Sequence, residues 1–363
     1  MDINRIIMAV FAVGALIGGI DFLIGNKWGF GEKFEEAVKL MPPTVFNMVG
    51  ILCLAPSIAV VLRVCISPLM KAVGLDPGML GGILALDMGG YPLATELATD
   101  PAIGTYSGIL VGCIFGCTLV FAIPFGMGVI KKETQKDYIT GIIIGLISMP
   151  VGFLAGGLVQ GIDFLKLVIQ TLPILILSAL LIVGLIKIPN KMTVFFQKLA
   201  AGLKIVINVG LVVGAVTYLL GIETEYLTSI TEGMTVVVNI TLALLGSLPF
   251  AKLLQVILNK PLKALGKKLK IQDSACVGIL VGMVSAVPVY TMMDDMDSRS
   301  RIVVSTFLID GMAILGAHLA YTAANAPEMT GPLLVCKISA SLVGLIIAFI
   351  YTGRHKSEEV KGE

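Results

Sequence analysis

The sequence predicts an all-α protein that crosses a membrane many times, and three observations lead to this fold class. Hydrophobic residues make up 56% of the 363-residue chain, the mean hydropathy is +0.97, and charged residues make up only 14%. Apolar runs of about 20 residues, the length of a helix that spans a bilayer, recur along the whole chain. Two of these runs are interrupted in a similar way. We therefore expect about nine full transmembrane helices and two re-entrant or broken helical hairpins, arranged as an inverted repeat.

Eleven apolar segments follow one another along the chain, each with ends defined to within a few residues. Charged residues between 25 and 43 predict a surface loop or an amphipathic turn after the first segment, and the tail from 353 onward is short and polar. The segments lie near 5–24, 44–66, 79–97, 103–130, 138–160, 164–187, 199–221, 234–258, 274–293, 302–325 and 330–351.

The third and ninth segments differ from the others because each consists of two short apolar halves around a helix breaker. The third contains LALDMGGYPLATELA, with Gly89, Gly90 and Pro92 as breakers. The ninth reads SACVGILVGM, VSAVP and VYTMMDDM, with Pro288 as its breaker. A kinked spanning helix is one interpretation, because membrane helices tolerate Gly and Pro. The other is a re-entrant hairpin or discontinuous helix, as in transporters.

The placement of Lys and Arg residues favours the hairpins. If both segments enter and leave on one side, with the C-terminal tail inside, most of the 26 Lys and Arg residues face the cytoplasm. If the ninth segment spanned fully, the lysine-rich loop between 252 and 270 would face outward. Cytoplasmic loops carry the excess of positive charge, so we predict two hairpins, an external N-terminus and a cytoplasmic C-terminus.

An internal repeat places the two interrupted segments at matching positions. LDPGMLGGIL at 75–84 aligns with IQDSACVGIL at 271–280, and Pro92 aligns with Pro288 at the same spacing. Five crossings then precede the second half and invert it, an arrangement that points to a transport site near the bilayer midplane. We predict a first repeat over 1–160, a connecting helix over 161–190, a second, inverted repeat over 191–352 and a cytoplasmic tail over 353–363.

Asp87 is the first candidate for a functional residue. A carboxylate at membrane depth costs about 2.5–3.5 kcal/mol on insertion scales, so a functional role is the default hypothesis. Its structural alternatives are to cap a half-helix or to pair with a lysine. Tyr91, one turn further on, can stack on an ammonium group. Glu96 is either a second ligand or a residue at the mouth of the hairpin.

Segment ten supplies three further candidates, Asp310, His318 and Asn325, on what we expect to be one continuous helix. On such a helix the side chains of Asp310 and His318 differ in direction by about 80°. His318 is the histidine at membrane depth, because His355 lies in the charged tail. It is either a buried, hydrogen-bonded structural residue or a substrate contact or proton-relay member, since its charge can change near physiological pH.

Several chemistries have no motif in the sequence. There is no phosphate-binding P-loop, no His-Glu-x-x-His pair and no Gly-x-Ser-x-Gly nucleophile turn. The six cysteines lie inside apolar segments and lack zinc-type spacing. We therefore expect a non-enzyme with no cofactor, no metal site and no nucleic-acid partner, embedded in a lipid bilayer. A homo-oligomer is compatible with the sequence, which does not specify the oligomeric state.

Three stretches of the sequence resemble the ethanolamine permease family, EutH: LALDMGGYPLATELA, MMDDMDSR and LGAHLAYTAAN. The similarity extends along the whole chain, and the first stretch is the most specific. The chain departs from the family pattern at Ala317, where the family carries an acidic residue, and Asp310 on nearly the same helix face is a candidate to replace that charge. The matching residues are Asp87, Met88, Gly89, Gly90, Glu96, Leu97, Ala98, Pro288, Asp297, Arg299, His318 and Asn325.

The resemblance implies a multi-pass permease of the bacterial cytoplasmic (inner) membrane that imports ethanolamine as a secondary transporter or facilitator. Asp87, with Glu96 as a further candidate, would then bind the ammonium group of the substrate. Two alternatives stay open. One is a sodium- or proton-coupled transporter of another small amine or amino acid, and the other is an integral-membrane enzyme that acts on amino-alcohols.

Overall fold

The computed structural model describes residues 3–84 and 90–359, and every regular element in these ranges is helical. Short helices alternate with long ones, and several π-helical and 3-10 turns are built into them. The first half contains α1 (Ile3–Leu23), α2 (Gly31–Lys39), α3 (Met41–Thr44), η1 (Val45–Val49), α4 (Gly50–Cys65), α5 (Ser67–Ala72), α6 (Met79–Ile83), α7 (Gly90–Leu97), α8 (Pro101–Thr105), η3 (Tyr106–Gly116), η4 (Thr118–Ala122), α9 (Ile123–Val129) and α10 (Gln135–Gln160). The second half contains α11 (Phe164–Lys187), α12 (Pro189–Leu220), α13 (Ile230–Leu269), α14 (Asp273–Gly282), α15 (Val287–Met292), η5 (Met293–Asp295), α16 (Ser298–Gly311), α17 (Ala317–Asn325), η6 (Pro327–Met329) and α18 (Thr330–Glu359).

Within the described ranges, eight helical stretches are long and apolar enough to cross a membrane, so the predicted count of nine is not confirmed. The charged stretch after α1, expected as a loop or turn, forms the amphipathic helix α2. The eight stretches are Arg5–Leu23, Gly31–Cys65, Pro101–Val129, Gln135–Gln160, Phe164–Lys187, Pro189–Leu220, Ile230–Leu269 and Pro327–Gly353.

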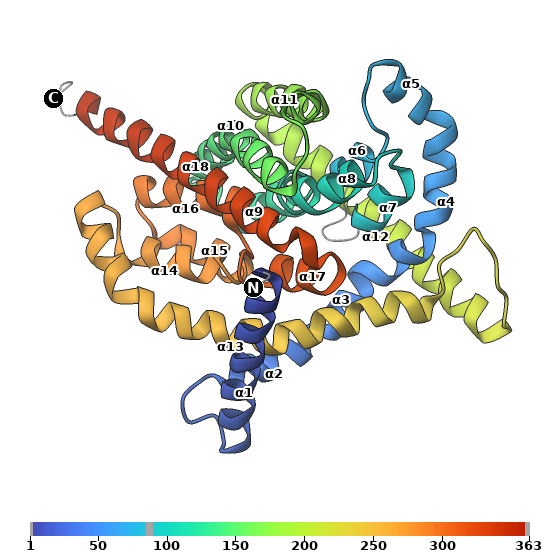
Figure 1. The fold of residues 1–363 in the computed structure, drawn as a ribbon. Helices are drawn as coiled ribbons and strands as arrows, with labels where there is room; N and C mark the ends of the chain where they lie inside the picture. The colour runs from blue at the N-terminus through green and yellow to red at the C-terminus, as the bar shows by residue number, and fades with distance from the viewer. Residues whose placement is uncertain (1–2, 85–89, 360–363) are drawn as a thin grey trace.

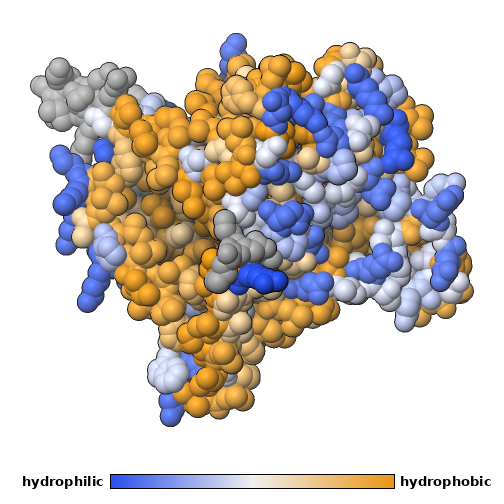
Figure 2. Space-filling model, in the orientation of Figure 1, coloured by the Kyte–Doolittle hydropathy of each residue, from blue (hydrophilic) through white to orange (hydrophobic). Residues whose placement is uncertain are grey.

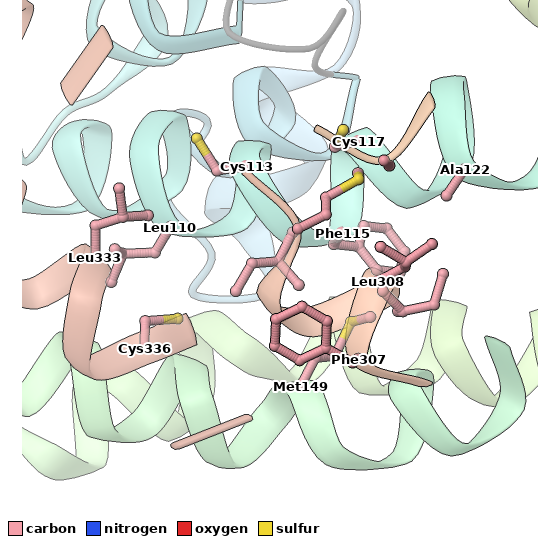
Figure 3. Packing of buried hydrophobic residues seen from close by; sticks show 14 of the residues in the cluster. Leu110, Cys113, Phe115, Cys117, Ala122, Met149, Phe307, Leu308, Leu333 and Cys336 are labelled. Atoms are coloured by element: carbon pink, nitrogen blue, oxygen red, sulfur yellow. The ribbon is translucent and has the colours of Figure 1, made fainter. Parts of the chain in front are cut away.

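The centre of the molecule is the bundle of α10, α16 and α18, which make extensive contacts with one another. A stripe of glycines on α10 allows this close approach, as small residues do at membrane helix interfaces. A Cβ atom at Gly141 would lie 2.3 Å from the Ser305 side chain, and one at Gly152 would lie 2.5 Å from the carbonyl oxygen of Cys336. Figure 3 shows buried side chains of η3, α10, α16 and α18 converging in this core.

Two long helices, α12 and α13, lie outside this bundle and carry apolar side chains on their exposed faces. In Figure 1, α13 runs along the lower side of the molecule, and α1 crosses it and projects below. The crossing is tight, because a Cβ atom at Gly14 would lie 2.2 Å from the carbonyl oxygen of Gly246. Figure 2 shows broad apolar areas on this face, consistent with contact with lipid.

The third predicted segment contains two short antiparallel helices, α6 and α7. Gly78 faces Ala98 near the base, and Gly81 faces Ala94 further along, so the two arms run in opposite directions. The Asp76 carboxylate joins their bases, accepting hydrogen bonds from the backbone N–H groups of Gly78, Thr99 and Asp100. Gln170 of α11 holds this base from outside by accepting from the N–H of Asp76 at 2.8 Å. The segment is therefore a helical hairpin in this structure.

The ninth predicted segment is a second hairpin, made of α14 and α15. Gly278 of α14 lies beside Val289 of α15. Its base is joined by the Gln272 side chain, whose carboxamide oxygen accepts from the N–H of Asp297 at 2.9 Å. Pro288 lies in the first turn of α15, just as Pro92 lies in the first turn of α7. Proline fits there because the first-turn N–H groups have no partner within their own helix.

The tenth predicted segment is not the continuous helix that we expected. It consists of α16 and α17, separated by an irregular stretch over 312–316. Ala313 has a positive φ of 54°, a conformation that non-glycine residues rarely adopt and that ends the helix. We expected a continuous helix because the sequence has no proline at this point. The helix-breaking residues present are the glycines at 311 and 316.

Candidate functional site

The tip of the second hairpin is hydrogen-bonded to the break between α16 and α17. The backbone N–H groups of Ala313 and Leu315 donate to the carbonyl oxygens of Gly282 and Met283, at 2.9 and 2.8 Å. A Cβ atom at Gly316 would lie 2.1 Å from the carbonyl oxygen of Val284, so this position requires glycine. Two interrupted helices thus satisfy each other's backbone groups. Irregular backbone inside a membrane is tolerated only where it is buried in protein or lines a cavity.

A cluster of ring-bearing side chains lies where the first hairpin meets α17. The rings of Tyr91 and Tyr321 are packed edge to face with their centroids 6.3 Å apart. Tyr91 is half-buried, Tyr321 is fully buried, and His318, one turn before Tyr321 on α17, is 3% exposed. Asn325 donates from its side chain to the carbonyl oxygen of Tyr321 at 2.9 Å. Tyr91 of the first hairpin is therefore in contact with Tyr321 of α17, the short helix that also carries the predicted site residues His318 and Asn325.

A second cluster, of buried charged and polar groups, lies inside the bundle of α10, α16 and α18. Asp310 of α16 is fully buried and accepts a hydrogen bond from the Ser148 hydroxyl at 2.6 Å. Lys337 of α18 is also fully buried, and its ammonium group donates to the carbonyl oxygens of Met312 and Cys113 at 3.1 and 3.3 Å. A buried lysine and a buried aspartate inside a membrane bundle are costly, so both are functional candidates.

The structure separates Asp310 from the other candidates of segment ten. We expected Asp310 on nearly the same helix face as Ala317 and offset from His318 on one helix. Because α16 ends at residue 311, Asp310 belongs to α16, whereas Ala317 and His318 are the first two residues of α17. Helical periodicity therefore does not relate them, and a shared helix face no longer supports Asp310 as the replacement for an acidic side chain at position 317.

The remaining predicted residues lie in or near the first hairpin. Asp87 and Gly89 fall outside the residues that the structure describes, as does the tip between α6 and α7. Gly90 is buried at the start of α7. Glu96 is exposed near the base, where its backbone oxygen accepts a hydrogen bond from the Arg63 guanidinium. Of the two positions considered for Glu96, the contacts fit the mouth of the hairpin.

Sequence reasoning missed the residues that fix the interrupted helices. Lys337 was not among the predicted site residues, although a lone lysine inside an apolar segment is itself a signal. Asp76 and Gln272 each lie just before a hairpin. A polar residue at such a position is usually interpreted as part of a solvated loop. Their roles depend on contacts across the hairpin base, which no local pattern reveals.

The described part of the chain contains no group of three or more His, Cys, Asp or Glu side chains placed to hold a metal ion. The polar groups of the two clusters are hydroxyls, amides, backbone carbonyls and single charges. Such groups suit the binding of a small polar cation by hydrogen bonds and charge.

The fold and these clusters define a class: a multi-pass helical membrane protein whose centre is built from interrupted helices, the construction used by secondary transporters. The chain matches the family described as "Ethanolamine utilisation protein, EutH" over residues 3–351. It belongs to that family. A multi-pass protein of a bacterial membrane, with a role in transport, follows from the family and the apolar helices.

Relatives align with the chain from end to end. The probable ethanolamine permease EutH of Listeria monocytogenes is 36% identical, with 99% of this chain and 98% of the relative covered. The probable ethanolamine permease EutH of Salmonella typhimurium is 31% identical, with 100% of this chain and 99% of the relative covered. A Bacillus subtilis relative, the uncharacterized protein YxeR, is 32% identical over 99% of this chain and 98% of its own length. No solved structure matches the chain.

Proposed function

We propose that the protein is a permease that carries ethanolamine, in its ammonium form, across the bacterial inner membrane into the cytoplasm. Relatives named probable ethanolamine permeases support the substrate. The structural observation that carries the proposal is the contact between the tip of the second hairpin and the break after α16. Transporters place their substrate sites where such discontinuous helices meet.

The chemistry of the substrate suits the cluster beside the first hairpin. Ethanolamine in its ammonium form has one positive charge and one hydroxyl group, so its site needs a negative charge, an aromatic surface and a hydroxyl partner. We assign the ammonium group to Asp87, and its aromatic surface to Tyr91 and Tyr321. His318 and Asn325 are our candidates for the hydroxyl. Asp310 is not assigned to the substrate, because its contacts lie with α10 and α18.

The inverted repeat is part of the same proposal, with its halves at 1–160 and 191–352. Contacts at matching positions support it. Asp76 and Gln272 join the two hairpin bases, and their spacing in the chain equals that of Pro92 and Pro288. Motion of the hairpin-bearing core relative to the outer helices would then expose the site to each side in turn, by analogy with other inverted-repeat transporters.

The test is uptake of labelled ethanolamine into proteoliposomes at low substrate concentration and mildly acidic pH, where the ammonium form dominates and leakage of the neutral amine is least. We expect Asp87→Asn to lose most of the uptake, because a neutral amide cannot balance the ammonium charge. Asp273→Asn is the matched control, since Asp273 is an exposed carboxylate in the first turn of the other hairpin. Normal uptake by a well-folded Asp87→Asn protein rules out the binding role of Asp87.

The same vesicles distinguish transport from catalysis. A permease delivers ethanolamine chemically unchanged, and an excess of unlabelled ethanolamine competes with the label more strongly than other small amines do. Recovery of the label in a different compound contradicts the proposal, and so does equal competition by amino acids.

A further inference from the structure

The Lys337 side chain is held by backbone carbonyl oxygens inside the bundle of α10, α16 and α18. Its ammonium group donates to two backbone carbonyl oxygens, Met312 O at 3.1 Å and Cys113 O at 3.3 Å. These oxygens come from different segments, one at the end of α16 and one in the π-helix η3. An ammonium group has three N–H donors, and among the described residues only these two acceptors bind it. Lys337 thus joins the two halves of the chain through main-chain oxygens.

Each of the two carbonyl oxygens lies at an irregularity of its helix. Met312 is the C-cap of α16, and the last carbonyl groups of a helix lack partners within it and carry the negative end of the helix dipole. In η3, the N–H of Cys117 bonds to the carbonyl oxygens of Gly112 and Ile114 and passes over Cys113. Helix ends and unwound backbone carbonyls of this kind coordinate Na⁺ in membrane transporters.

An acidic side chain of α16, Asp310, is buried in the same helix bundle as Lys337. The Asp310 carboxylate interacts electrostatically with Lys337, although no direct ion pair joins the two in the described part of the chain. Its Oδ2 atom accepts from Ser148, whereas its Oδ1 atom is fully buried and has no hydrogen-bond partner within residues 3–84 and 90–359. Carboxylate and backbone carbonyl oxygens are the kinds of ligand that bind monovalent cations in membrane proteins.

We propose that the carbonyl oxygens of Cys113 and Met312, balanced by the Asp310 carboxylate, form a binding site for a monovalent cation, and that the Lys337 ammonium group permanently fills it. The lysine holds the break after α16 against η3 in the way that a bound Na⁺ ion would. Removing the lysine side chain empties the site and leaves Asp310 unbalanced, so that Na⁺ from solution can enter.

The binding site stands apart from the substrate site, but its consequence for transport rests on the proposed function. A permease with a built-in cation does not need external Na⁺ to order its core. Uptake by the wild-type protein is therefore expected to be the same in Na⁺, K⁺ and N-methylglucamine media.

The test compares Lys337→Ala with Lys337→Met in purified, detergent-solubilised protein. Alanine leaves the volume and the oxygen ligands open, whereas methionine fills the volume with an apolar chain of similar length. A ligand that binds only the folded state raises the unfolding temperature as its concentration rises above its dissociation constant. We expect NaCl, and not N-methylglucamine chloride, to raise the unfolding temperature of Lys337→Ala in a saturable way. The wild type and Lys337→Met should show no such difference.

A double variant tests the role of the Asp310 carboxylate. Adding Asp310→Asn to Lys337→Ala should abolish the Na⁺-specific shift, because the balancing charge is gone. Equal responses of Lys337→Ala to the two salts overturn the proposal, and so does a Na⁺-specific shift in Lys337→Met.

If Lys337→Ala cannot be purified in either salt, the wild-type protein decides: Na⁺-stimulated uptake or Na⁺-specific stabilisation of the wild type contradicts a permanently filled site. Absence of uptake in every medium counts against the proposed function and leaves the stability result intact.

Discussion

The two hairpins occupy matching places in the chain but are held together by different chemistry. The base of the first is joined by a carboxylate, Asp76, which is 7% exposed and binds groups from both arms. The base of the second is joined by the neutral carboxamide of Gln272, which is exposed. The arms also differ, because Gly81 lies against backbone atoms of Ala94, whereas the nearest neighbour of Gly278 is the flexible end of Met296. Within the described residues, the base and arms of the first hairpin are therefore joined more tightly than those of the second.

The largest expected loss of stability comes from substitutions of the residues that join the two hairpin bases, Asp76 and Gln272. Asp76→Ala removes the acceptor of the N–H groups of Gly78, Thr99 and Asp100, and hydrogen bonds to charged groups are worth about 1.5–3 kcal/mol each, so we expect at least about 3 kcal/mol of destabilisation. Gln272→Ala removes a neutral acceptor at an exposed position and should cost about 1 kcal/mol. Thermal unfolding of both variants in one detergent measures the difference. Equal losses would show that the two bases are equivalent.

A smaller effect is expected from the glycines between the arms. A Cβ atom at Gly81 would lie 2.3 Å from the backbone nitrogen of Ala94, so Gly81→Ala must push the arms apart. Overpacking of this kind costs about 1–3 kcal/mol. At Gly278 the nearest atom would be the Cε of Met296 at 3.2 Å, which can move aside. Gly278→Ala should therefore be close to neutral in the same unfolding assay, and a larger loss at Gly278 than at Gly81 contradicts the comparison.

The smallest effect concerns the residues that follow the hairpins. Asp100 caps α8 and Asp297 caps α16, each accepting from a backbone N–H, but Asp100 also pairs with Lys166. The hydrogen bond from Lys166 lowers the pKa of the Asp100 carboxyl below its ordinary value. Because the folded pKa is the lower one, the pair stabilises the fold above the unfolded pKa of about 4 and loses this contribution as the pH falls through the folded pKa.

The measurement is the unfolding temperature of the wild type and Asp100→Asn as the pH is lowered through this window. At neutral pH the exposed pair contributes about 0.2–1 kcal/mol, so the variant should be slightly less stable there and the two curves should converge in acid. Asp297→Asn serves as the control, because the structure shows no lysine or arginine pairing with Asp297 within its described residues. Parallel curves for the wild type and Asp100→Asn would show that Lys166 contributes nothing.

The sequence predicted the hairpins better than the continuous helices. Breakers such as Pro92 and Pro288 mark the start of a second arm, because proline has a fixed backbone angle that a local pattern can reveal. The break after α16 depends instead on hydrogen bonds from Ala313 and Leu315 to the other hairpin, and the π-helical turns of η3 depend on packing. Tyr91 was a candidate because its ring follows Asp87 by one turn, and His318 because it lies at membrane depth and can change its charge near physiological pH. The carbonyl partners of Lys337 could not be predicted, because they lie at irregularities of α16 and η3 that the sequence does not show.

The length of α13 has a consequence for how the protein sits in its membrane. The helix spans Ile230–Leu269, 40 residues, and at about 1.5 Å per residue it is about 60 Å long. A hydrocarbon layer is about 30 Å thick, so even a helix tilted by about 40° leaves a third of its length outside. The excess falls at the end that carries Lys260, Lys263, Lys267 and Lys268. These side chains would then lie among anionic lipid headgroups, which would hold the outer end of α13 at the membrane surface.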